Sequence, residues 1–454
     1  MAERFDVVVM GAGPTGEHAV GILVEAGKKV ALVEREFIGG ECSGWACMPT
    51  KTLLRPTEVQ GEADTVAGVS EPSFDWPKIR DYRNYITVDW DDSARIESYE
   101  KKGVTVIKAP CRLAGAGRVE AGGRELEAEH VIVATGSSSS IPPLDGLDEA
   151  GYWTNREAME MQELPRSVVI LGGGPVGTEL AQMYRRFGAG VAVVERADDV
   201  VDREDPELCD LVEDVLRREG VELHLGRSGE AVRRDGDERV VTLDDGTELR
   251  AQELIVAVGR KPNTEDIGLE TVGIEPGERG ELPIDERCRA ADRLWAAGDV
   301  TGVALFTHTG KYQARVICAN ILGREAKVDY RAIPRIVFTH PEVAAVGLTE
   351  EQARDQGVDV ATAKIELISS ISRPYTYEEL YEGDWGGTLK LIADRSRGVL
   401  VGAWTVAPMA SEWIHQAVLA IRAEVPLDVL RDTIPGFPSY SEGILVALRE
   451  LDAA

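Results

Sequence analysis

Two cysteines five positions apart, Cys42 and Cys47, stand in the segment 39–51, which reads GGECSGWACMPTK. On an ideal α-helix five residues rise about 7.5 Å and turn about 140°, so the two Cα atoms would lie roughly 8–9 Å apart, whereas a disulfide needs about 4.4–6.8 Å. If the two cysteines are joined, the backbone between them must therefore depart from a regular helix. Gly44 and Pro49 favour this, because glycine adopts dihedral angles that other residues avoid and proline cannot donate to the carbonyl group four residues back. A strained bond is easily reduced, so the segment is a candidate redox centre.

A dinucleotide-binding fingerprint comes directly before this segment. A predicted buried strand runs into Gly11-Ala-Gly13-Pro-Thr-Gly16, and an amphipathic helix and a second strand ending in Glu34 come next. The first two glycines let the backbone turn tightly and approach a pyrophosphate at the helix N-terminus, and the third lets helix and strand pack closely. Glu34 is expected to accept hydrogen bonds from a ribose.

The same pattern recurs with Gly172, Gly174, Gly177 and Glu195. In both copies 23 positions separate the first glycine from the acid, from 11 to 34 and from 172 to 195. The chain therefore carries two nucleotide-binding units of matched design. Glu195 would accept from a free 2′-hydroxyl and repel a 2′-phosphate, which favours NAD(H) over NADP(H), although the neighbouring Arg196 softens that preference.

Three smaller features complete the candidate site. A buried strand over 130–136 ends in Thr135-Gly136, a small-residue turn suited to passing beneath a cofactor. Gly259 lies in the turn that closes the second unit, and Asp299 comes after a later strand, where it would either bind a cofactor polyol or cap a turn. The acidic, aromatic-rich segment 56–100 is expected to be a helical layer over the first domain.

The overall composition limits the partners. The 454 residues are 43% hydrophobic and 28% charged, as in ordinary globular proteins, and the formal net charge of −29 disfavours nucleic acid and anionic membrane surfaces. No secretory leader precedes the first strand, and no apolar run approaches the roughly 18–20 residues that cross a bilayer, so a cytoplasmic protein is expected. The cysteines at 111, 209, 288 and 318 are expected to be packing residues, and Cys111 is also a candidate cofactor contact. No metal-ligand motif is present, and His340 and His415 are expected in the core.

The two fingerprints, the cysteine pair before Pro-Thr-Lys51 and the Ala-Thr-Gly and Gly-Asp turns make the chain resemble the two-dinucleotide flavoprotein disulfide reductases. These include lipoamide dehydrogenase, glutathione reductase and mercuric reductase. The resemblance covers nearly the whole chain. It implies a homodimer with an α/β fold: two Rossmann-like dinucleotide-binding domains and an α+β dimerisation domain. The expected divisions are 1–144 for FAD and the redox-active disulfide, 145–263 for NAD(P), 264–330 for a return to the FAD-binding region, and 331–454 for dimerisation.

The resemblance also implies roles. Electrons would pass from nicotinamide to flavin to a Cys42–Cys47 disulfide, with Cys47 facing the flavin as the charge-transfer thiolate and Cys42 attacking a small-molecule electron acceptor. Lys51 and Glu179 match an ion pair beside the flavin. The implied FAD contacts are Gly11, Gly13, Gly16, Glu34, Cys111, Thr135, Gly136, Asp299 and Thr307, and the implied NAD(P)H contacts are Gly172, Gly174, Gly177, Glu195 and Gly259.

The tail departs from the family pattern. Members that reduce disulfides read His-Pro-Thr-x-x-Glu, with the histidine as acid/base, whereas this chain has Phe437 in the histidine position and keeps Pro438 and Glu442. Losing a positioned acid/base typically costs about 10²–10⁴-fold. Tyr440 is a weak substitute, because the unperturbed pKa of tyrosine is about 10. The vicinal cysteines expected in mercuric reductase are also missing from residues 450–454, and Trp45 between the cysteines either packs or shapes acceptor access.

The leading interpretation is therefore an NAD(P)H-dependent flavoenzyme whose acceptor needs little acid catalysis: a quinone, a metal ion or an unusual disulfide. A dihydrolipoamide dehydrogenase is one alternative, and Phe437 argues against it. A non-catalytic flavin-binding scaffold is another, and it would need none of Cys42, Cys47, Lys51 and Glu179.

Overall fold

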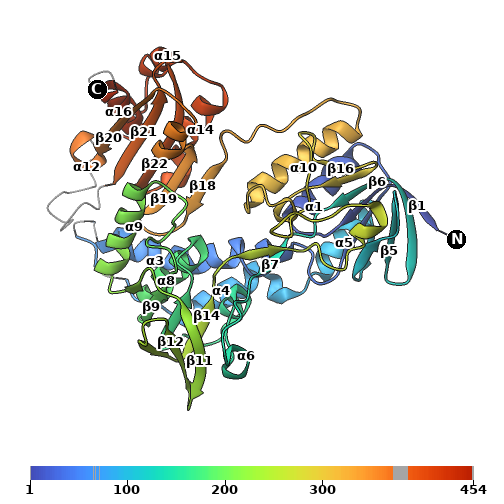
Figure 1. Cartoon of the computed structure of the whole chain (residues 1–454), viewed down its shortest axis with the longest axis horizontal. Coiled ribbons are helices and arrows are strands. Elements are labelled where there is room, and N and C mark those ends of the chain that lie inside the picture. Colours follow the sequence, from blue (N-terminus) through green and yellow to red (C-terminus); the bar gives the residue numbers. More distant parts are fainter. Residues whose placement is uncertain (1, 65, 67, 71, 372–386, 452–454) are drawn as a thin grey trace.

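The computed structural model describes residues 2–64, 66, 68–70, 72–371 and 387–451, so three of the tail residues 450–454 lie outside it. The described chain forms lobes built around separate sheets, as Figure 1 shows. Within this part of the chain, no helix combines the length and apolarity needed to cross a membrane.

The first lobe is built on a mostly parallel sheet with the strand order β16-β17-β6-β1-β2-β3, extended by β5 and β4. The side chains from Val7 to Met10 in β1 are fully buried, because α1 and α10 cover one face of the sheet and loops and the β4–β5 hairpin pack on the other. Burial on both faces explains why this strand reads as an unbroken apolar run. The elements are β1 (Glu3–Met10), α1 (Pro14–Glu25), β2 (Val30–Glu34), β3 (Thr105–Lys108), β4 (Cys111–Leu113), β5 (Arg118–Ala121), β6 (Arg124–Val133), η2 (Leu269–Val272), β16 (Arg289–Ala291), β17 (Leu294–Ala296), η3 (Asp299–Thr301) and α10 (Thr307–Ile321).

The second lobe repeats the arrangement on a smaller scale. Its four-stranded sheet is parallel throughout, in the order β10-β9-β8-β14, and an antiparallel sheet of β11, β12 and β13 lies beside it. The elements are α6 (Leu147–Ala150), α7 (Asn155–Glu160), β8 (Ser167–Leu171), α8 (Pro175–Arg186), β9 (Gly190–Val194), α9 (Pro206–Arg218), β10 (Glu222–His224), β11 (Gly229–Asp235), β12 (Glu238–Leu243), β13 (Glu248–Ala251) and β14 (Glu253–Val256).

Two antiparallel segments connect the lobes. β7 (Ser137–Ser139) pairs with β15 (Arg260–Pro262), so the chain leaves the first lobe and returns to it side by side. The serine- and proline-rich stretch after Gly136 is thus a connection between the two nucleotide-binding units.

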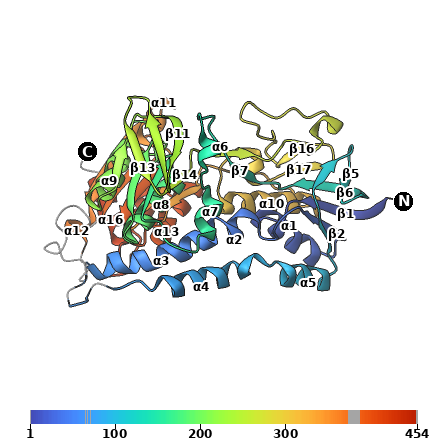
Figure 2. The same ribbon diagram turned by 90° about the horizontal axis from the view of Figure 1, so that it is seen from below.

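The segment 56–100 is helical, as predicted, but it covers more than the first lobe. Its elements are α3 (Cys47–Asp64), α4 (Trp76–Ile86), η1 (Val88–Trp90) and α5 (Ser93–Lys101), preceded by α2 (Gly40–Gly44). Figure 2 shows α3 and α4 running together across the molecule. The fully buried Arg83 donates to the Met161 carbonyl oxygen at 2.7 Å, which ties α4 to the second lobe.

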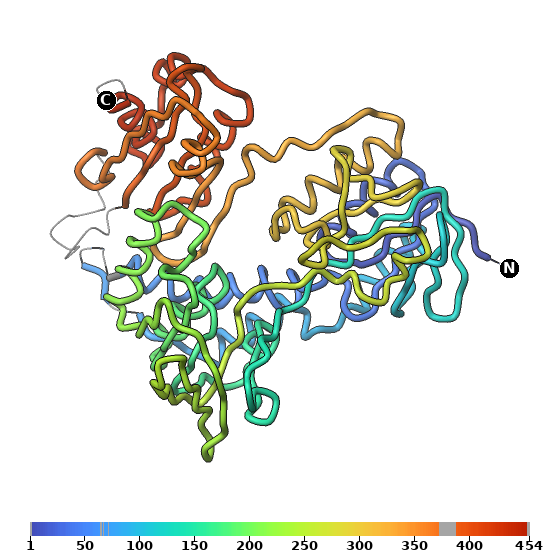
Figure 3. Tube along the Cα trace, viewed as in Figure 1, coloured from blue at the N-terminus to red at the C-terminus, as the bar shows by residue number. Residues whose placement is uncertain are grey.

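The C-terminal lobe is a five-stranded antiparallel sheet in the order β18-β19-β22-β21-β20, with helices packed on it. Figure 3 shows the chain crossing to this lobe after α10. Its elements are β18 (Pro334–Val337), β19 (Glu342–Gly347), α11 (Glu350–Asp355), β20 (Val360–Glu366), α12 (Leu367–Ser370), β21 (Thr388–Asp394), β22 (Val399–Ala407), α13 (Ala410–Trp413), α14 (His415–Arg422), α15 (Leu427–Arg431) and α16 (Glu442–Glu450).

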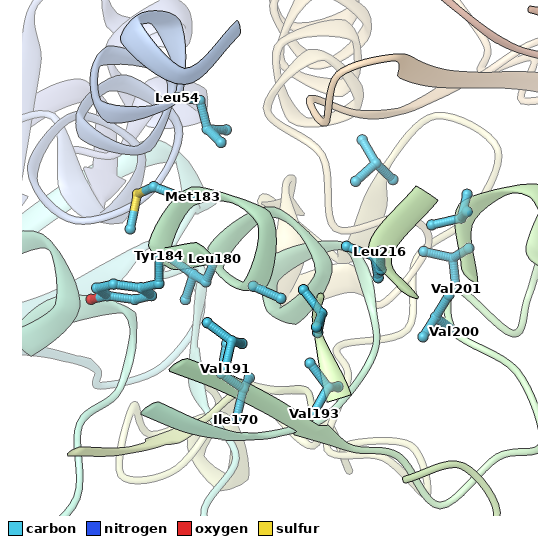
Figure 4. Close-up of a cluster of buried hydrophobic side chains, with 14 of the residues drawn as sticks. Leu54, Ile170, Leu180, Met183, Tyr184, Val191, Val193, Val200, Val201 and Leu216 are labelled. Atoms are coloured by element: carbon cyan, nitrogen blue, oxygen red, sulfur yellow. The ribbon is translucent and has the colours of Figure 1, made fainter. Parts of the chain in front are cut away.

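One hydrophobic cluster joins all three lobes. Leu54 of α3 packs in the same cluster as Leu180 and Met183 of α8 (Figure 4), and Val337 and Trp404 of the C-terminal lobe belong to it too. The helix that begins at Cys47 is therefore held by a core that extends well beyond the first lobe.

Candidate active site

The first glycine-rich turn is built as its pattern predicts. Gly11 has φ +100°, and a Cβ there would lie 2.3 Å from the Ala134 carbonyl oxygen, so no other residue fits. A Cβ at Gly16 would lie 2.0 Å from the Gly11 oxygen, which explains the third glycine. Glu34 accepts from the backbone N–H of Ala12 and of Glu36, both at 2.8 Å, and these bonds fix its carboxylate at the end of β2.

An open cleft with an empty volume of about 790 Å³ begins at this turn. Predicted contacts from four separate parts of the chain line it: Gly11, Gly13, Glu34, Cys42, Thr135, Gly136, Asp299 and Thr307. Cys111 instead lines a second hollow on β4 and β5, together with Pro110 and Gly122, so its role in cofactor binding stays a prediction.

The residues of the cleft fit an FAD. Gly13 is the N-cap of α1, and a Cβ there would meet nothing within 4 Å, which leaves the helix N-terminus open to a pyrophosphate. Glu34 and Asp299 both line the cleft, so their carboxylates would be available to accept from the ribose and polyol hydroxyls of a bound FAD. Ser137 donates to Asp299 at 2.6 Å and orients it.

The two cysteines lie at a break between helices, which confirms that the backbone departs from a regular helix there. α2 ends at Gly44, Trp45 has φ −139°, and α3 begins at Cys47. The Thr307 hydroxyl lies 3.3 Å from the Cys42 sulfur and 3.5 Å from the Cys47 sulfur, so it contacts both thiols. Both cysteines are free thiols in this structure.

The two thiols are electrostatically different. A hydrogen bond from Cys42, the Thr307 hydroxyl and the Lys51 ammonium group together lower the pKa of Cys47 to about 6, against burial, which raises it. The pKa of Cys42 is raised by the hydrogen bond to Cys47, by burial and by the charge of Cys47. Cys47 is therefore the better thiolate. Of the two, Cys42 lines the cleft, so the orientation in which Cys47 faces the flavin and Cys42 the acceptor stays a prediction.

Lys51 and Glu179 form the predicted ion pair, with the Lys51 Nζ 2.9 and 2.7 Å from the two carboxylate oxygens. Lys51 lies one turn after Cys47 on α3, and Glu179 projects from α8 of the second lobe. Phe338, which was not predicted from the sequence, contacts both members of the ion pair. Its N–H donates to Glu179 at 2.9 Å, and the Lys51 ammonium lies 4.7 Å from the centre of its ring.

The second glycine-rich turn repeats the first. Gly172 has φ +106°, a Cβ there would lie 2.4 Å from the Ala257 oxygen, and Gly174 is the N-cap of α8. Glu195 accepts from the N–H groups of Gly173 and Ala197 at 2.6 and 2.8 Å. Among the other predicted contacts, a Cβ at Gly177 would lie 1.9 Å from the Gly172 oxygen, and Gly259 has φ +137°.

The tail lies in another lobe. Figures 1 and 2 place α16, which begins at Glu442, apart from α2 and α10. Phe437 is 73% exposed, and Tyr440 is 4% exposed and stacked on Trp413 at 6.1 Å between ring centres. One carboxylate oxygen of Glu442, Oε2, is buried without a hydrogen-bond partner in the described part of the chain.

Other polar groups of the cleft were missed by sequence reasoning. Arg260 donates to the Ser137 hydroxyl at 2.7 Å, and Asn263 exchanges hydrogen bonds with the backbone and side chain of Thr135. Their position in the sequence could have identified them, since both residues come after a buried strand that closes a nucleotide-binding unit.

Of the two histidines expected in the core, His340 is buried and its pKa falls to about 3 through burial, whereas His415 is exposed. Among the described residues, no group of three or more His, Cys, Asp or Glu side chains is placed to hold a metal ion.

Known proteins resemble this chain over its whole length. The family model described as pyridine nucleotide-disulphide oxidoreductase matches residues 5–316, and that family's dimerisation-domain model matches residues 333–448. A mercuric reductase of Streptomyces lividans is 34% identical, covering 98% of this chain and 95% of its own. A dihydrolipoyl dehydrogenase of Halobacterium salinarum is 32% identical, covering 97% and 95%.

Two solved structures are also similar, each at 28% identity. LpdA from Mycobacterium tuberculosis has a TM-score of 0.88 and covers 99% of this chain and 100% of its own. The Cu(II) complex of the HOCl-induced flavoprotein disulfide reductase RclA from Escherichia coli has a TM-score of 0.87 with the same coverage.

Proposed function

Since the chain belongs to the pyridine nucleotide-disulphide oxidoreductase family and is an NAD(P)H-dependent flavoprotein oxidoreductase, we propose that it reduces a Cys42–Cys47 disulfide with NADH and passes the electrons to a thiophilic metal ion. FAD, when bound in the cleft, supplies the two-electron carrier between nicotinamide and disulfide. The dimerisation domain supports a homodimer.

The Cys42–Cys47 pair accounts for the electrons and protons of the proposed reaction. A hydride from NADH and one proton convert the disulfide to two thiols. The thiols then bind the acceptor as thiolates and give up two electrons, to one Hg(II) or to two Cu(II) ions, the S–S bond forms again, and two protons leave. Two adjacent sulfurs, one with a lowered pKa, are suited to bind a soft cation before reducing it.

The tail is the observation that carries the choice of acceptor. A disulfide substrate leaves as a thiolate that must be protonated. In disulfide-reducing relatives a histidine in the position of Phe437 would supply that proton, from a C-terminal domain that completes the active site of the partner subunit. A phenyl ring cannot do so, and among the described residues one Glu442 carboxylate oxygen is buried without a hydrogen-bond partner. A metal ion needs no such proton. Two of the similar proteins have names consistent with a metal-ion acceptor, a mercuric reductase and a reductase solved as a Cu(II) complex, whereas the dihydrolipoyl dehydrogenase is consistent with the alternative.

The acceptor is tested by anaerobic reduction with NADH and then addition of Hg(II), Cu(II), quinones, lipoamide and other disulfides in turn. We expect rapid reoxidation by a metal ion and slow reoxidation by lipoamide. Cys42→Ser separates the acceptors, because a quinone takes electrons without the thiol whereas metal ions and disulfides need it. Rapid lipoamide turnover by the unsubstituted protein would contradict the proposal.

A gain of function tests the role of Phe437. Phe437→His restores a titratable ring at the position of the histidine in disulfide-reducing relatives and should raise lipoamide reduction at least about 10-fold, a small part of what such a group can contribute. Phe437→Leu, which changes shape without adding a proton donor, is the matched control and should leave lipoamide reduction low.

A further inference from the structure

Trp45, the residue between the two cysteines, is anchored to a helix outside the redox segment. The side chain is 7% exposed, and its indole N–H donates to Glu160 at 2.6 Å. Its ring meets Phe37 edge-on, with 5.6 Å between the ring centres. Trp45 therefore packs on Phe37 and α7, and because it also lines the cleft its role in acceptor access stays a prediction.

Glu41, which directly precedes Cys42, is held by the same helix. Its carboxylate accepts from Arg156 Nε at 2.6 Å and from Asn155 Nδ2 at 3.0 Å. Asn155 Nδ2 also donates to the Trp45 carbonyl oxygen at 2.8 Å, and the Arg156 guanidinium group lies 4.3 Å from the centre of the Trp45 ring. Three residues of α7 therefore hold both ends of the segment between Glu41 and Trp45.

The helix α7 is itself fixed to the sheet of the second lobe. Just before it, the Trp153 N–H donates to the Leu254 oxygen at 2.7 Å, and the Val256 N–H donates to the Trp153 oxygen at 2.8 Å, so Trp153 bridges to β14. Thr154 and Glu157 form a capping box at its first turn. A helix anchored at its start can act as a rigid support.

The redox segment needs such a support because it breaks where the thiols are. The helical hydrogen bonds of α2 end with the Trp45 N–H donating to the Glu41 oxygen at 2.8 Å, and the Thr50 N–H donates to the Ala46 oxygen at 3.0 Å at the start of α3, so the chain departs from a regular helix between the two thiols. Both sulfurs must nevertheless stay in contact with the Thr307 hydroxyl, which comes from α10.

We propose that α7 is the positioning element of the redox segment, with Glu160 and Arg156 holding Trp45 and Glu41 so that the Cys42 and Cys47 thiols stay adjacent at Thr307. The inference rests on the proposed redox role of the two cysteines. Glu160 acts through Trp45 and is a positioning residue, whereas Arg156 holds Glu41 and also lines the cleft.

The test is the pH dependence of Cys47 alkylation. The reduced holoenzyme is treated with iodoacetamide across pH 5–9, and labelling of the Cys47 peptide is measured by mass spectrometry. The unsubstituted protein should show a midpoint near the pKa of about 6. Glu160→Leu should raise the midpoint by about one pH unit or more, because Cys47 loses the neighbouring thiol that stabilises its thiolate.

The sign of the shift separates positioning from simple electrostatics. Removing the negative charge of Glu160 by itself would not raise the midpoint, because a carboxylate can only disfavour a thiolate. Glu160→Gln removes the same charge but keeps a carbonyl acceptor for the indole, so it should not raise the midpoint. Trp45→Phe keeps an aromatic ring under Arg156 and loses the N–H, and it should raise the midpoint even if Glu160→Leu does not fold.

The outcomes also separate this inference from the proposed function. A midpoint near 6 in the unsubstituted protein that stays unchanged in Glu160→Leu and Trp45→Phe, with full flavin content, would overturn the inference alone. An ordinary midpoint near about 8.5 in the unsubstituted protein would count against the redox role of Cys47 and, with it, against the inference.

Discussion

The two glycine-rich turns match, but the segments after their acidic residues differ. In both turns, a glycine with φ near +100° begins the turn and the acid accepts from two backbone N–H groups. After Glu34 the chain packs Gly40 onto the first turn, where a Cβ would lie 2.8 Å from Gly13 Cα, and then delivers Cys42. After Glu195 the Val201 N–H donates to the Gly173 oxygen at 2.9 Å, and the chain then enters α9.

The second of these segments is held by the C-terminal lobe. Arg335 pairs with Glu204 at 2.6 and 2.8 Å, and the buried Lys390 pairs with Asp205 at 3.3 Å. The fingerprint therefore specifies the turn, and the residues after the acid determine what lies next to it. In the first unit this is the cysteine pair, and in the second it is an interdomain clamp, the ion pairs of Arg335 with Glu204 and of Lys390 with Asp205.

The largest expected effect comes from adding a methyl group to each turn. Gly11→Ala should yield protein without flavin, because the Cβ collides with the Ala134 oxygen and φ is positive. Gly172→Ala should keep its flavin, which dithionite still reduces, and lose reduction by NADH by about 10²-fold or more. Absorbance spectra of the two purified variants check this. Loss of flavin from Gly172→Ala would contradict the assignment of the first turn to FAD and the second to the nicotinamide nucleotide.

Breaking the Lys51–Glu179 ion pair, which joins the two units, should have the next largest effect on flavin reduction. Glu179→Gln leaves the Lys51 ammonium group without its carboxylate partner, and NADH-driven flavin reduction should slow by about 10–100-fold in stopped-flow measurements. The corresponding position of the first unit, five residues after the second glycine, is His18, so His18→Gln is the matched control. An equal effect of both substitutions would remove the special role of Glu179.

Glu195 should set the choice of nucleotide. Glu195→Ser removes the carboxylate that repels a 2′-phosphate and should shift the ratio of kcat/KM for NADH and NADPH towards NADPH by about 10-fold, or about 1.4 kcal/mol. Glu34→Ser should not change that ratio. A preference for NADPH in the unsubstituted protein would show that Arg196 outweighs Glu195.

Breaking the interdomain clamp should have the smallest effect on the reaction with NADH. Arg335→Met removes the bidentate pair with Glu204 and should raise KM for NADH by about two- to fivefold with little change in kcat, because the chain packed on Gly173 becomes less well held. Arg395→Met, which removes an exposed pair with Asp359 in the same lobe, is the control. A fall in kcat without a change in KM would assign the clamp a different role.

The sequence predicted those parts of the site that local rules determine. The turns at Gly11 and Gly172, the buried strands and the break between Cys42 and Cys47 each result from dihedral preferences or apolar runs within a few residues. The contacts that complete the site join distant residues: Thr307 reaches Cys42 across 265 positions, and Phe338 reaches Glu179 across 159. Thr307 was identified by resemblance as a flavin contact, and its contact with both thiols required the fold.

The helical segment 56–100 illustrates the same limit. Its helices were predicted, but the packing of Arg83 against Met161 depends on where the second lobe lies. The identity of the acceptor is harder still to predict from the sequence. Phe437 shows that the acid/base histidine is absent, but it does not identify the molecule that the site binds.

The most direct measurement of the central claim is thiol counting after anaerobic NADH addition. The oxidised protein is mixed with one equivalent of NADH, quenched with iodoacetamide and digested, and each cysteine peptide is quantified. The account predicts that labelling of Cys42 and Cys47 rises together with flavin reduction and disappears again when Hg(II) or Cu(II) is turned over, while labelling of the buried Cys209 stays constant. Reoxidation by the metal ion at the same rate in Cys42→Ser, or no NADH-dependent labelling of either cysteine, would contradict it.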